Sequence, residues 1–190
     1  MQLGGYATHF VGKWDAGMAT PSHTPLGRGY QSSLNYFNHE NDYWSESQLF
    51  NKVCATRHIL DLWDTDAPAY GMNGTGQYEE YIFQDRLTSI IQAHDVSQPL
   101  FLFYGSHIAH VPLEVPEEQF KKFDFMDNDT GECIGSTPFI YPGHTGHWRC
   151  RQQYVSMVNL LDGVVANITT QFKQRGMWNN TLMVFSADSS

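Results

Sequence analysis

The sequence predicts an α/β fold with a largely parallel sheet, because helical and strand-like segments alternate along the second half of the chain. Residues 77–96 carry apolar side chains at helical spacing, and residues 152–175 repeat that pattern over a longer stretch. An apolar run without alternation follows each helix, at residues 100–104 and 181–185, as expected for strands covered on both faces. Helix, strand, helix and strand in this order indicate parallel strands flanked by helices.

The first 76 residues give a weaker pattern. Residues 6–11 predict a strand, since aromatic and β-branched side chains are frequent there, and Gly12 marks its end. Residues 16–76 are interrupted by Gly, Pro, Asn and Ser and are predicted to be mostly loop, with at most a short strand near residues 53–62. Nothing in the sequence divides the chain, so we expect residues 1–190 to form one domain.

Composition and charge exclude several classes of function. The net charge of -9 argues against non-specific binding to nucleic acid or to anionic membranes, which needs clustered Lys and Arg. No run approaches the roughly 20 apolar residues of a transmembrane helix, and residues 1–5 are unlike a signal peptide. Glycosylation sequons are more frequent than the roughly one or two expected by chance, which predicts a glycoprotein of the secretory pathway. They begin at Asn73, Asn128, Asn167 and Asn179.

Three cysteines leave one unpaired if the other two form a disulfide. A bridge between Cys133 and Cys150 would close a loop rich in Gly and Pro and would stabilise the fold by about 3 kcal/mol. The alternative is a zinc site in which His144 and His147 join these two cysteines. An oxidising compartment favours the disulfide.

Polar side chains follow three of the predicted strands at their carboxyl ends. Because ligands of parallel α/β sheets bind beyond these ends, the side chains predict a candidate active site. Each also has a structural explanation, such as a solvated lysine, a locally bonded histidine or a helix-capping aspartate. In chain order they are Lys13 and Asp15, His107 and His110, and Asp188 and Ser189.

Three segments carry a family resemblance. Residues 5–14 have the pattern Gly-Tyr-x-Thr-x-x-x-Gly-Lys-Trp, and residues 110–116 have the pattern His-x-Pro-Leu-x-Val-Pro. Residues 178–188 run from Trp-Asn-Asn-Thr through an apolar stretch to Ser-Ala-Asp. In this order the segments resemble motifs of the type I sulfatases, in particular their arylsulfatase B-like members. The resemblance spans nearly the whole chain, apart from an apparent insertion near residues 127–148.

The resemblance implies an alkaline phosphatase-like fold and the hydrolysis of sulfuric esters, with sulfated carbohydrates as the suggested substrates. In such enzymes a formylglycine, made from Cys or Ser, attacks the sulfur while a cation, usually calcium, and a lysine hold the sulfate oxygens. Lys13 matches that lysine and His110 matches the histidine near the leaving-group oxygen. Asp188 matches a metal-binding carboxylate.

The chain also departs from the family pattern. Asp15 stands where the family has a histidine, and Ser189 stands where it has an asparagine that binds the metal. The formylglycine motif Cys-x-Pro-x-Arg or Ser-x-Pro-x-Arg is absent from the sequence. The resemblance therefore implies a partial catalytic domain, incomplete at both ends, that alone hydrolyses no aryl sulfate. Two alternatives remain open: a non-catalytic sulfatase-like binding or structural protein, and a phosphoesterase of the same superfamily.

Overall fold

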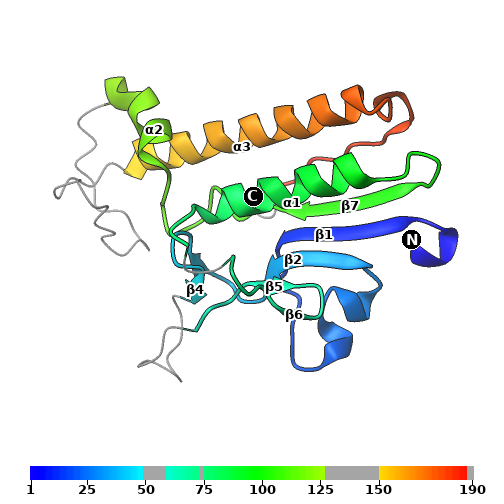
Figure 1. The fold of residues 1–190 in the computed structure, drawn as a ribbon. Coiled ribbons are helices and arrows are strands. Elements are labelled where there is room, and N and C mark those ends of the chain that lie inside the picture. Colours follow the sequence, from blue (N-terminus) through cyan, green and yellow to red (C-terminus); the bar gives the residue numbers. More distant parts are fainter. Residues whose placement is uncertain (49–58, 73–74, 127–149, 188–190) are drawn as a thin grey trace.

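The computed structural model is built on a mixed five-stranded sheet (Figure 1). Strand β1 (Ala7–Lys13) pairs in parallel with β2 (Ser32–Tyr36) on one side and with β7 (Leu100–Gly105) on the other. These pairings confirm the predicted α/β class with a largely parallel sheet. The structure describes residues 1–48, 59–72, 75–126 and 150–187.

Short antiparallel strands extend the sheet beyond β2. Strand β5 (Trp63–Asp64) pairs with β2, and β6 (Ala67–Pro68) pairs with β5, so the sheet order is β6-β5-β2-β1-β7. A separate ladder joins β3 (Asn41–Asp42) to β4 (Ser47–Gln48). Strand β7 therefore forms one edge of the described sheet.

The long helices lie on one face of the sheet, in two layers (Figure 1). Helix α1 (Glu79–Ala93) packs on β1, and α3 (Cys150–Gln174) packs against α1. Both helices were predicted, with bounds that differ by a few residues. The short helix α2 (Glu117–Phe120) contacts α3. Short 3₁₀ helices span Gln2–Gly4, Pro21–His23, Leu26–Arg28, Lys121–Met126 and Trp178–Asn180.

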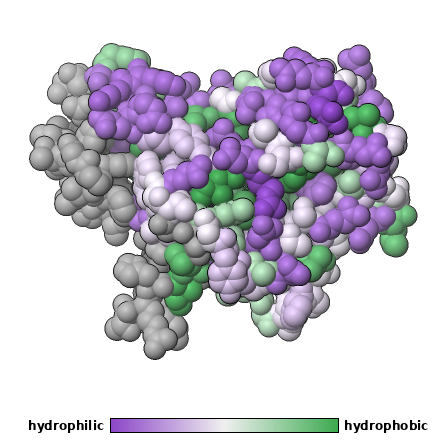
Figure 2. Space-filling model, viewed as in Figure 1, coloured by the Kyte–Doolittle hydropathy of each residue, from purple (hydrophilic) through white to green (hydrophobic). Residues whose placement is uncertain are grey.

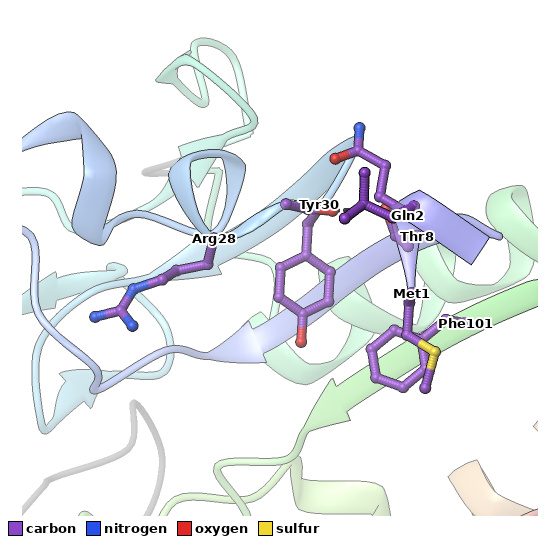
Figure 3. A pocket seen from close by; sticks show the side chains of 8 residues that line it. Met1, Gln2, Thr8, Arg28, Tyr30 and Phe101 are labelled. Atoms are coloured by element: carbon purple, nitrogen blue, oxygen red, sulfur yellow. Dashed lines mark hydrogen bonds between the residues drawn. The ribbon is translucent and has the colours of Figure 1, made fainter. Parts of the chain in front are cut away.

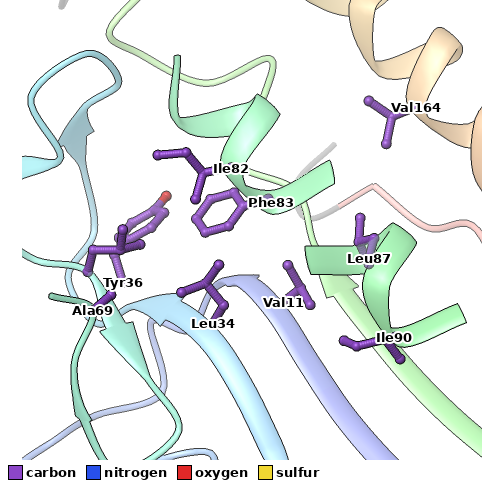
Figure 4. Close-up of a cluster of buried hydrophobic side chains, with 10 residues drawn as sticks. Val11, Leu34, Tyr36, Ala69, Ile82, Phe83, Leu87, Ile90 and Val164 are labelled. Atoms are coloured by element: carbon purple, nitrogen blue, oxygen red, sulfur yellow. The ribbon is translucent and has the colours of Figure 1, made fainter. Parts of the chain in front are cut away.

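The main core lies between the sheet and α1 (Figure 4). Val11 and Leu34 project from β1 and β2 toward Phe83 and Leu87 of α1, and Val164 of α3 joins the same cluster. Burying side chains of this size contributes about 1.5–3 kcal/mol each. A second cluster lies near the carboxyl end of the sheet and consists of Tyr43, Tyr78, Ile108, Val115, Met157 and Leu160.

Aromatic side chains occupy the other face of the sheet. Phe10 and Phe103 stack with ring centroids 5.5 Å apart, and Tyr30 stacks on Phe101 at 6.1 Å. Phe103 is 48% exposed, because the long helices cover only the opposite face. The prediction that residues 100–104 are buried on both faces was therefore wrong.

The segment predicted as the last strand is not a strand in the structure. Residues 181–187 carry no strand assignment, and Leu182, Val184 and Phe185 are 88%, 77% and 71% exposed. A strand needs a neighbour for its backbone hydrogen bonds. Among the described strands, β1 pairs with β7 and none pairs with this segment. Its apolar composition suits a strand, but its partner is not among the described residues.

The region predicted as mostly loop, residues 16–76, contains β2 as well as the short strands. Strand β2 was missed because its sequence, Ser-Ser-Leu-Asn-Tyr, is short and consists mostly of Ser and Asn, which are frequent in turns. Ser33 and Asn35 are buried together with the apolar residues of β2. Most of the strand considered near residues 53–62 lies outside the described residues.

Cys150, the first residue of α3, is disulfide-bonded. Its possible partners, Cys54 and Cys133, lie outside the described residues, as do His144 and His147. A zinc site that uses the Cys150 thiolate is wrong, since a sulfur in a disulfide cannot act as a thiolate ligand.

The described helices are covered by polar side chains on their outer side. Figure 2 shows hydrophilic residues over most of the upper part of the view, where α2 and α3 lie, and hydrophobic residues mainly between them and the sheet. Among these helices, none combines the length and the apolar character that a membrane span requires.

Candidate anion-binding site at the carboxyl end of the sheet

Two facing glycines bring the ends of β1 and β7 close together. Gly12 lies opposite Gly105 in the parallel ladder and has a φ of 103°. A Cβ atom on Gly12 would lie well under 3.0 Å from the Gly105 carbonyl group. This close approach requires glycine at position 12. It places Lys13 at the edge of the sheet where the loop after β7 begins.

Four polar side chains at or after the ends of β1, β2 and β7 form a cluster at this edge. Lys13 Nζ lies 3.5 Å from Asp15 Oδ2, and His39 Nδ1 lies 3.0 Å from the same oxygen. Lys13 Nζ is also 3.4 Å from His39 Nδ1. The His110 ring stands perpendicular to the His39 ring, with centroids 5.2 Å apart. We call Lys13, Asp15, His39 and His110 the edge cluster.

Asp15 is the carboxylate that holds the edge cluster together. Burial acts to raise the pKa of Asp15, but the hydrogen bond from His39 and the charge of Lys13 outweigh it, so the pKa is lowered. Asp15 has a φ of 45°, a left-handed conformation that Asp tolerates better than most residues. The side chain is therefore ionised at neutral pH and faces two basic groups.

His110 is held by the loop that follows β7. Its Nδ1 lies 2.7 Å from the Val111 carbonyl oxygen, so Nδ1–H donates there and Nε2 is left for other partners. The Tyr43 hydroxyl, with one proton to donate, lies within hydrogen-bonding distance of three backbone carbonyls of this loop, at 3.4 Å from those of His107 and His110 and 3.2 Å from that of Val111. Tyr78 donates to the carbonyl of Glu114 at 2.7 Å. Two buried tyrosines thus fix the loop that carries His110.

A buried polar group lies beneath the edge cluster. His107 is stacked on Tyr43 with ring centroids 4.2 Å apart, and its two nitrogens lie 3.3 Å from Glu79 Oε2 and 3.6 Å from Glu80 Oε2. Burial, with smaller effects of the Lys13 and His110 charges, lowers the pKa of His107 to about 3. Burial raises the pKa of Glu80 to about 8 and that of Glu79 well above its usual value. The group is therefore neutral: an uncharged imidazole between protonated carboxyls.

The structure brings together three of the predicted site residues, Lys13, Asp15 and His110. It separates His107 from them, because this side chain is fully buried. Asp188 and Ser189 lie outside the described residues. The roles of Lys13, Asp15, His110, Asp188 and Ser189 remain predictions.

Sequence reasoning missed His39. It follows β2 by three residues, within the stretch predicted to be loop, so no strand end marked its position. A correct assignment of β2 would have placed His39 beside Lys13, since Tyr36 lies opposite Lys13 in the parallel ladder.

The described residues do not form a calcium site. They contain no group of three or more His, Cys, Asp or Glu side chains arranged to hold a metal. The carboxylate of the edge cluster, Asp15, already faces the ammonium of Lys13 and the imidazole of His39. Calcium prefers several oxygen ligands, which this set does not supply.

A pocket of about 300 Å³ lies at the opposite end of β1 (Figure 3). Thr8, near the start of the strand, lines it together with Arg28, Tyr30 and Phe101. Thr8 and Lys13 are five residues apart along an extended strand, or roughly 16 Å. The pocket is therefore separate from the edge cluster.

Comparison with known proteins identifies the family of the chain. The Sulfatase family model matches residues 1–189, which is nearly the whole chain. The chain belongs to the sulfatase family. It is 26% identical over 186 residues to arylsulfatase J of Mus musculus, an alignment that covers 97% of this chain and 27% of that protein. It is 22% identical to an arylsulfatase of Klebsiella aerogenes, over 97% of this chain and 45% of that protein.

Solved structures show the same fold. The crystal structure of Ps i-CgsB matches with a TM-score of 0.66 at 19% identity, over 92% of this chain and 35% of that chain. The same protein in complex with k-i-k-neocarrahexaose matches with a TM-score of 0.65 at 20% identity, over 94% of this chain and 36% of that chain. This sulfatase-family chain thus spans between about a quarter and a half of the length of the relatives it matches.

Proposed function

We propose that this chain belongs to a sulfuric ester hydrolase and supplies groups that bind the sulfate of the substrate. The observation that carries the proposal is the meeting of Lys13 and His110 at one edge of the sheet, linked through His39. Lys13 is the last residue of β1 and His110 lies in the loop after β7, so both are at the carboxyl ends of parallel strands, where α/β proteins bind ligands.

The residue chemistry suits a sulfate ester. Lys13 carries a compact charge suited to a tetrahedral anion, and its side chain is only 12% exposed, which strengthens the attraction. Nε2 of His110 is available to a leaving-group oxygen, since Nδ1 is engaged with the Val111 carbonyl. Because Lys13 is paired with Asp15, a sulfate must compete with that carboxylate for the ammonium.

The proposed substrates are sulfated carbohydrates. The support is the family of the chain and its similarity in fold to Ps i-CgsB, whose structure was solved with k-i-k-neocarrahexaose. Family membership also brings the expectation of calcium, for which Asp188 and Ser189 remain the proposed ligands, and of a formylglycine, whose motif this sequence lacks. Bound calcium would stabilise charge on the sulfate oxygens.

We further propose a secreted or lysosomal location. The support is the number of sequons, two of which, at Asn167 and Asn179, lie at exposed positions. A disulfide at Cys150 also suits an oxidising compartment. Peptide-N-glycosidase treatment of the protein from a eukaryotic secretory host should lower its mass, and an unchanged mass would contradict the glycoprotein assignment.

Sulfate binding to the purified chain tests the proposed function. Isothermal titration with sodium sulfate should show saturable binding that weakens about tenfold or more in Lys13→Met, which removes the ammonium. Lys122→Met, at an exposed lysine of the 3₁₀ helix after α2, is the matched control and should bind like the wild type. Equal affinity in Lys13→Met and the wild type would overturn the proposal, and tighter binding of phosphate than of sulfate would favour a phosphoesterase.

One observation favours a second candidate, a sulfatase-like protein that binds without catalysis. Asp15 places a negative charge beside Lys13, where the resemblance expects an imidazole. Turnover of 4-methylumbelliferyl sulfate by the full-length protein that contains this chain would distinguish a hydrolase from a protein that only binds. The 190-residue chain alone should give none, since no formylglycine can form in it, and measurable turnover would refute this expectation.

A further inference from the structure

We propose that His39 is a third anion-binding group of the edge cluster, and that Asp15 is a positioning residue that fixes its imidazole. The identity of the anion as the sulfate of an ester rests on the proposed function. The geometry of the imidazole does not, because it follows from contacts among the described residues.

His39 is placed between the two predicted sulfate-binding groups. Its Nδ1 lies 3.4 Å from Lys13 Nζ, and its ring meets that of His110 edge to face, with centroids 5.2 Å apart. The side chain is 63% exposed, so a ligand can reach it. Three basic groups at or after the ends of three strands therefore face one accessible surface.

The Asp15 carboxylate determines which nitrogen of His39 is free. Nδ1 lies 3.0 Å from Asp15 Oδ2, and a carboxylate can only accept, so Nδ1–H donates to it. Lys13 Nζ also lies near Nδ1, but at 3.4 Å and as a donor, so it cannot share a nitrogen that is already protonated. Nε2 is left as the ring atom that can meet an anion, and it donates a hydrogen bond there when the imidazole is protonated. The hydrogen bond between His39 and Asp15 also joins the loops after β1 and β2, since the two residues are 24 positions apart in the sequence.

The hydrogen bond to His39 explains why a carboxylate can lie beside a site that binds sulfate. An aspartate alone would repel an anion. An aspartate that binds an imidazole supplies a donor in the place where the sulfatase resemblance expects a histidine, at position 15. Residues 15 and 39 together thus present the imidazole that residue 15 alone presents in the family pattern.

Charged and titratable groups approach His39 from the end of β1, from the loops after β1 and β7, and from the residue that follows His39. Lys13 and Asp15 come from β1 and the loop that follows it, and His110 comes from the loop after β7. Glu40 follows His39 directly; burial raises the pKa of Glu40, while the charges of His39 and Lys13 oppose that effect. A protonated His39 would therefore join Lys13 in attracting an anion, while the negative charge of the Asp15 carboxylate would oppose it.

The direct test is an NMR titration of the wild-type 190-residue chain with sodium sulfate, which reads the imidazole ¹H–¹³C signals near pH 6. We expect the His39 and His110 signals to shift together and to saturate with one affinity. The signal of His23, which lies outside the edge cluster, should not move. A stationary His39 signal during saturable binding that depends on Lys13 would overturn this inference and leave the proposed function intact.

Variants test the role of each side chain. His39→Gln should weaken sulfate binding about fivefold or more, while the matched control His23→Gln should leave it unchanged. The ¹⁵N spectrum of His39 should report the Nδ1-protonated tautomer in the wild type and in Asp15→Asn, which keeps an acceptor, and its loss in Asp15→Ala. An unchanged tautomer in Asp15→Ala would refute the positioning role. If no sulfate binds at all, the proposed function fails, whereas the tautomer measurement still decides the Asp15–His39 contact.

Discussion

Glu80→Gln should make the protein less sensitive to rising pH. Glu80 lies at the start of α1 with no exposed side-chain area, and it accepts a hydrogen bond from the Tyr104 hydroxyl. Burial raises its pKa from 4.5 to about 8 in the folded state. Glutamine has the same shape, can accept from Tyr104, and stays neutral at every pH.

The sign and size of the effect follow from proton linkage. A carboxyl whose pKa is raised by folding contributes most to stability below its unfolded pKa of 4.5, and this contribution is lost as the pH rises toward 8. Between these values the unfolded chain releases a proton that the folded chain keeps, so stability falls by about 1.4 kcal/mol per pH unit. From about pH 5 to about pH 7.5 the loss from Glu80 is about 3 kcal/mol.

Urea unfolding followed by circular dichroism at several pH values measures this difference. The free energy of unfolding of Glu80→Gln should exceed that of the wild type by about 3 kcal/mol near pH 7.5 and should match it near pH 4.5. Asp85→Asn, at an exposed position on the same helix, is the control and should follow the wild type. Titratable groups that do not contact residue 80 cancel in the comparison. Parallel stability curves for Glu80→Gln and the wild type would refute the reasoning.

Two further predictions concern contacts that shape the sheet. Gly12→Ala should unfold the protein or lower its melting temperature strongly, because the added Cβ would overlap the Gly105 carbonyl group; Gly176→Ala, also at positive φ but in open space, should cost only about 1 kcal/mol in thermal unfolding. Arg86→Met should lower the free energy of unfolding by about 2 kcal/mol, since it removes two hydrogen bonds to Asp64 that tie α1 to β5. A wild-type melting temperature in Gly12→Ala or in Arg86→Met would contradict the corresponding contact.

The long helices could be predicted from the sequence because their apolar spacing repeats over many turns. Residues 77–96 and 152–175 were predicted, and α1 and α3 span Glu79–Ala93 and Cys150–Gln174. The burial of the acidic pair at the start of α1 was not predicted. Glu79 and Glu80 are fully buried beside His107, although acidic side chains are mostly exposed in proteins.

The strands were harder to predict, because strand formation depends on pairing information that a single sequence does not contain. Strand β2 is short and consists mostly of Ser and Asn, which are frequent in turns, so its composition indicated a loop. Residues 181–185 have the composition of a strand but no partner among the described strands. A helix satisfies its backbone hydrogen bonds internally, whereas a strand needs a neighbour that may come from any part of the chain. Lys13 and His110 were found because each follows a strand that the sequence did reveal.

The position of His39 shows why a motif and a site are different things. Parallel pairing of β2, β1 and β7 brings the loops after all three strands to one edge, so an imidazole needed there can come from any of them. In the sequence, Asp15 replaces the histidine of the family pattern. In the folded sheet, the Asp15 carboxylate accepts the Nδ1–H of His39 at 3.0 Å, so an imidazole still lies beside Lys13. A substitution inside a motif therefore has to be judged with the residues that the strand pairing places next to it.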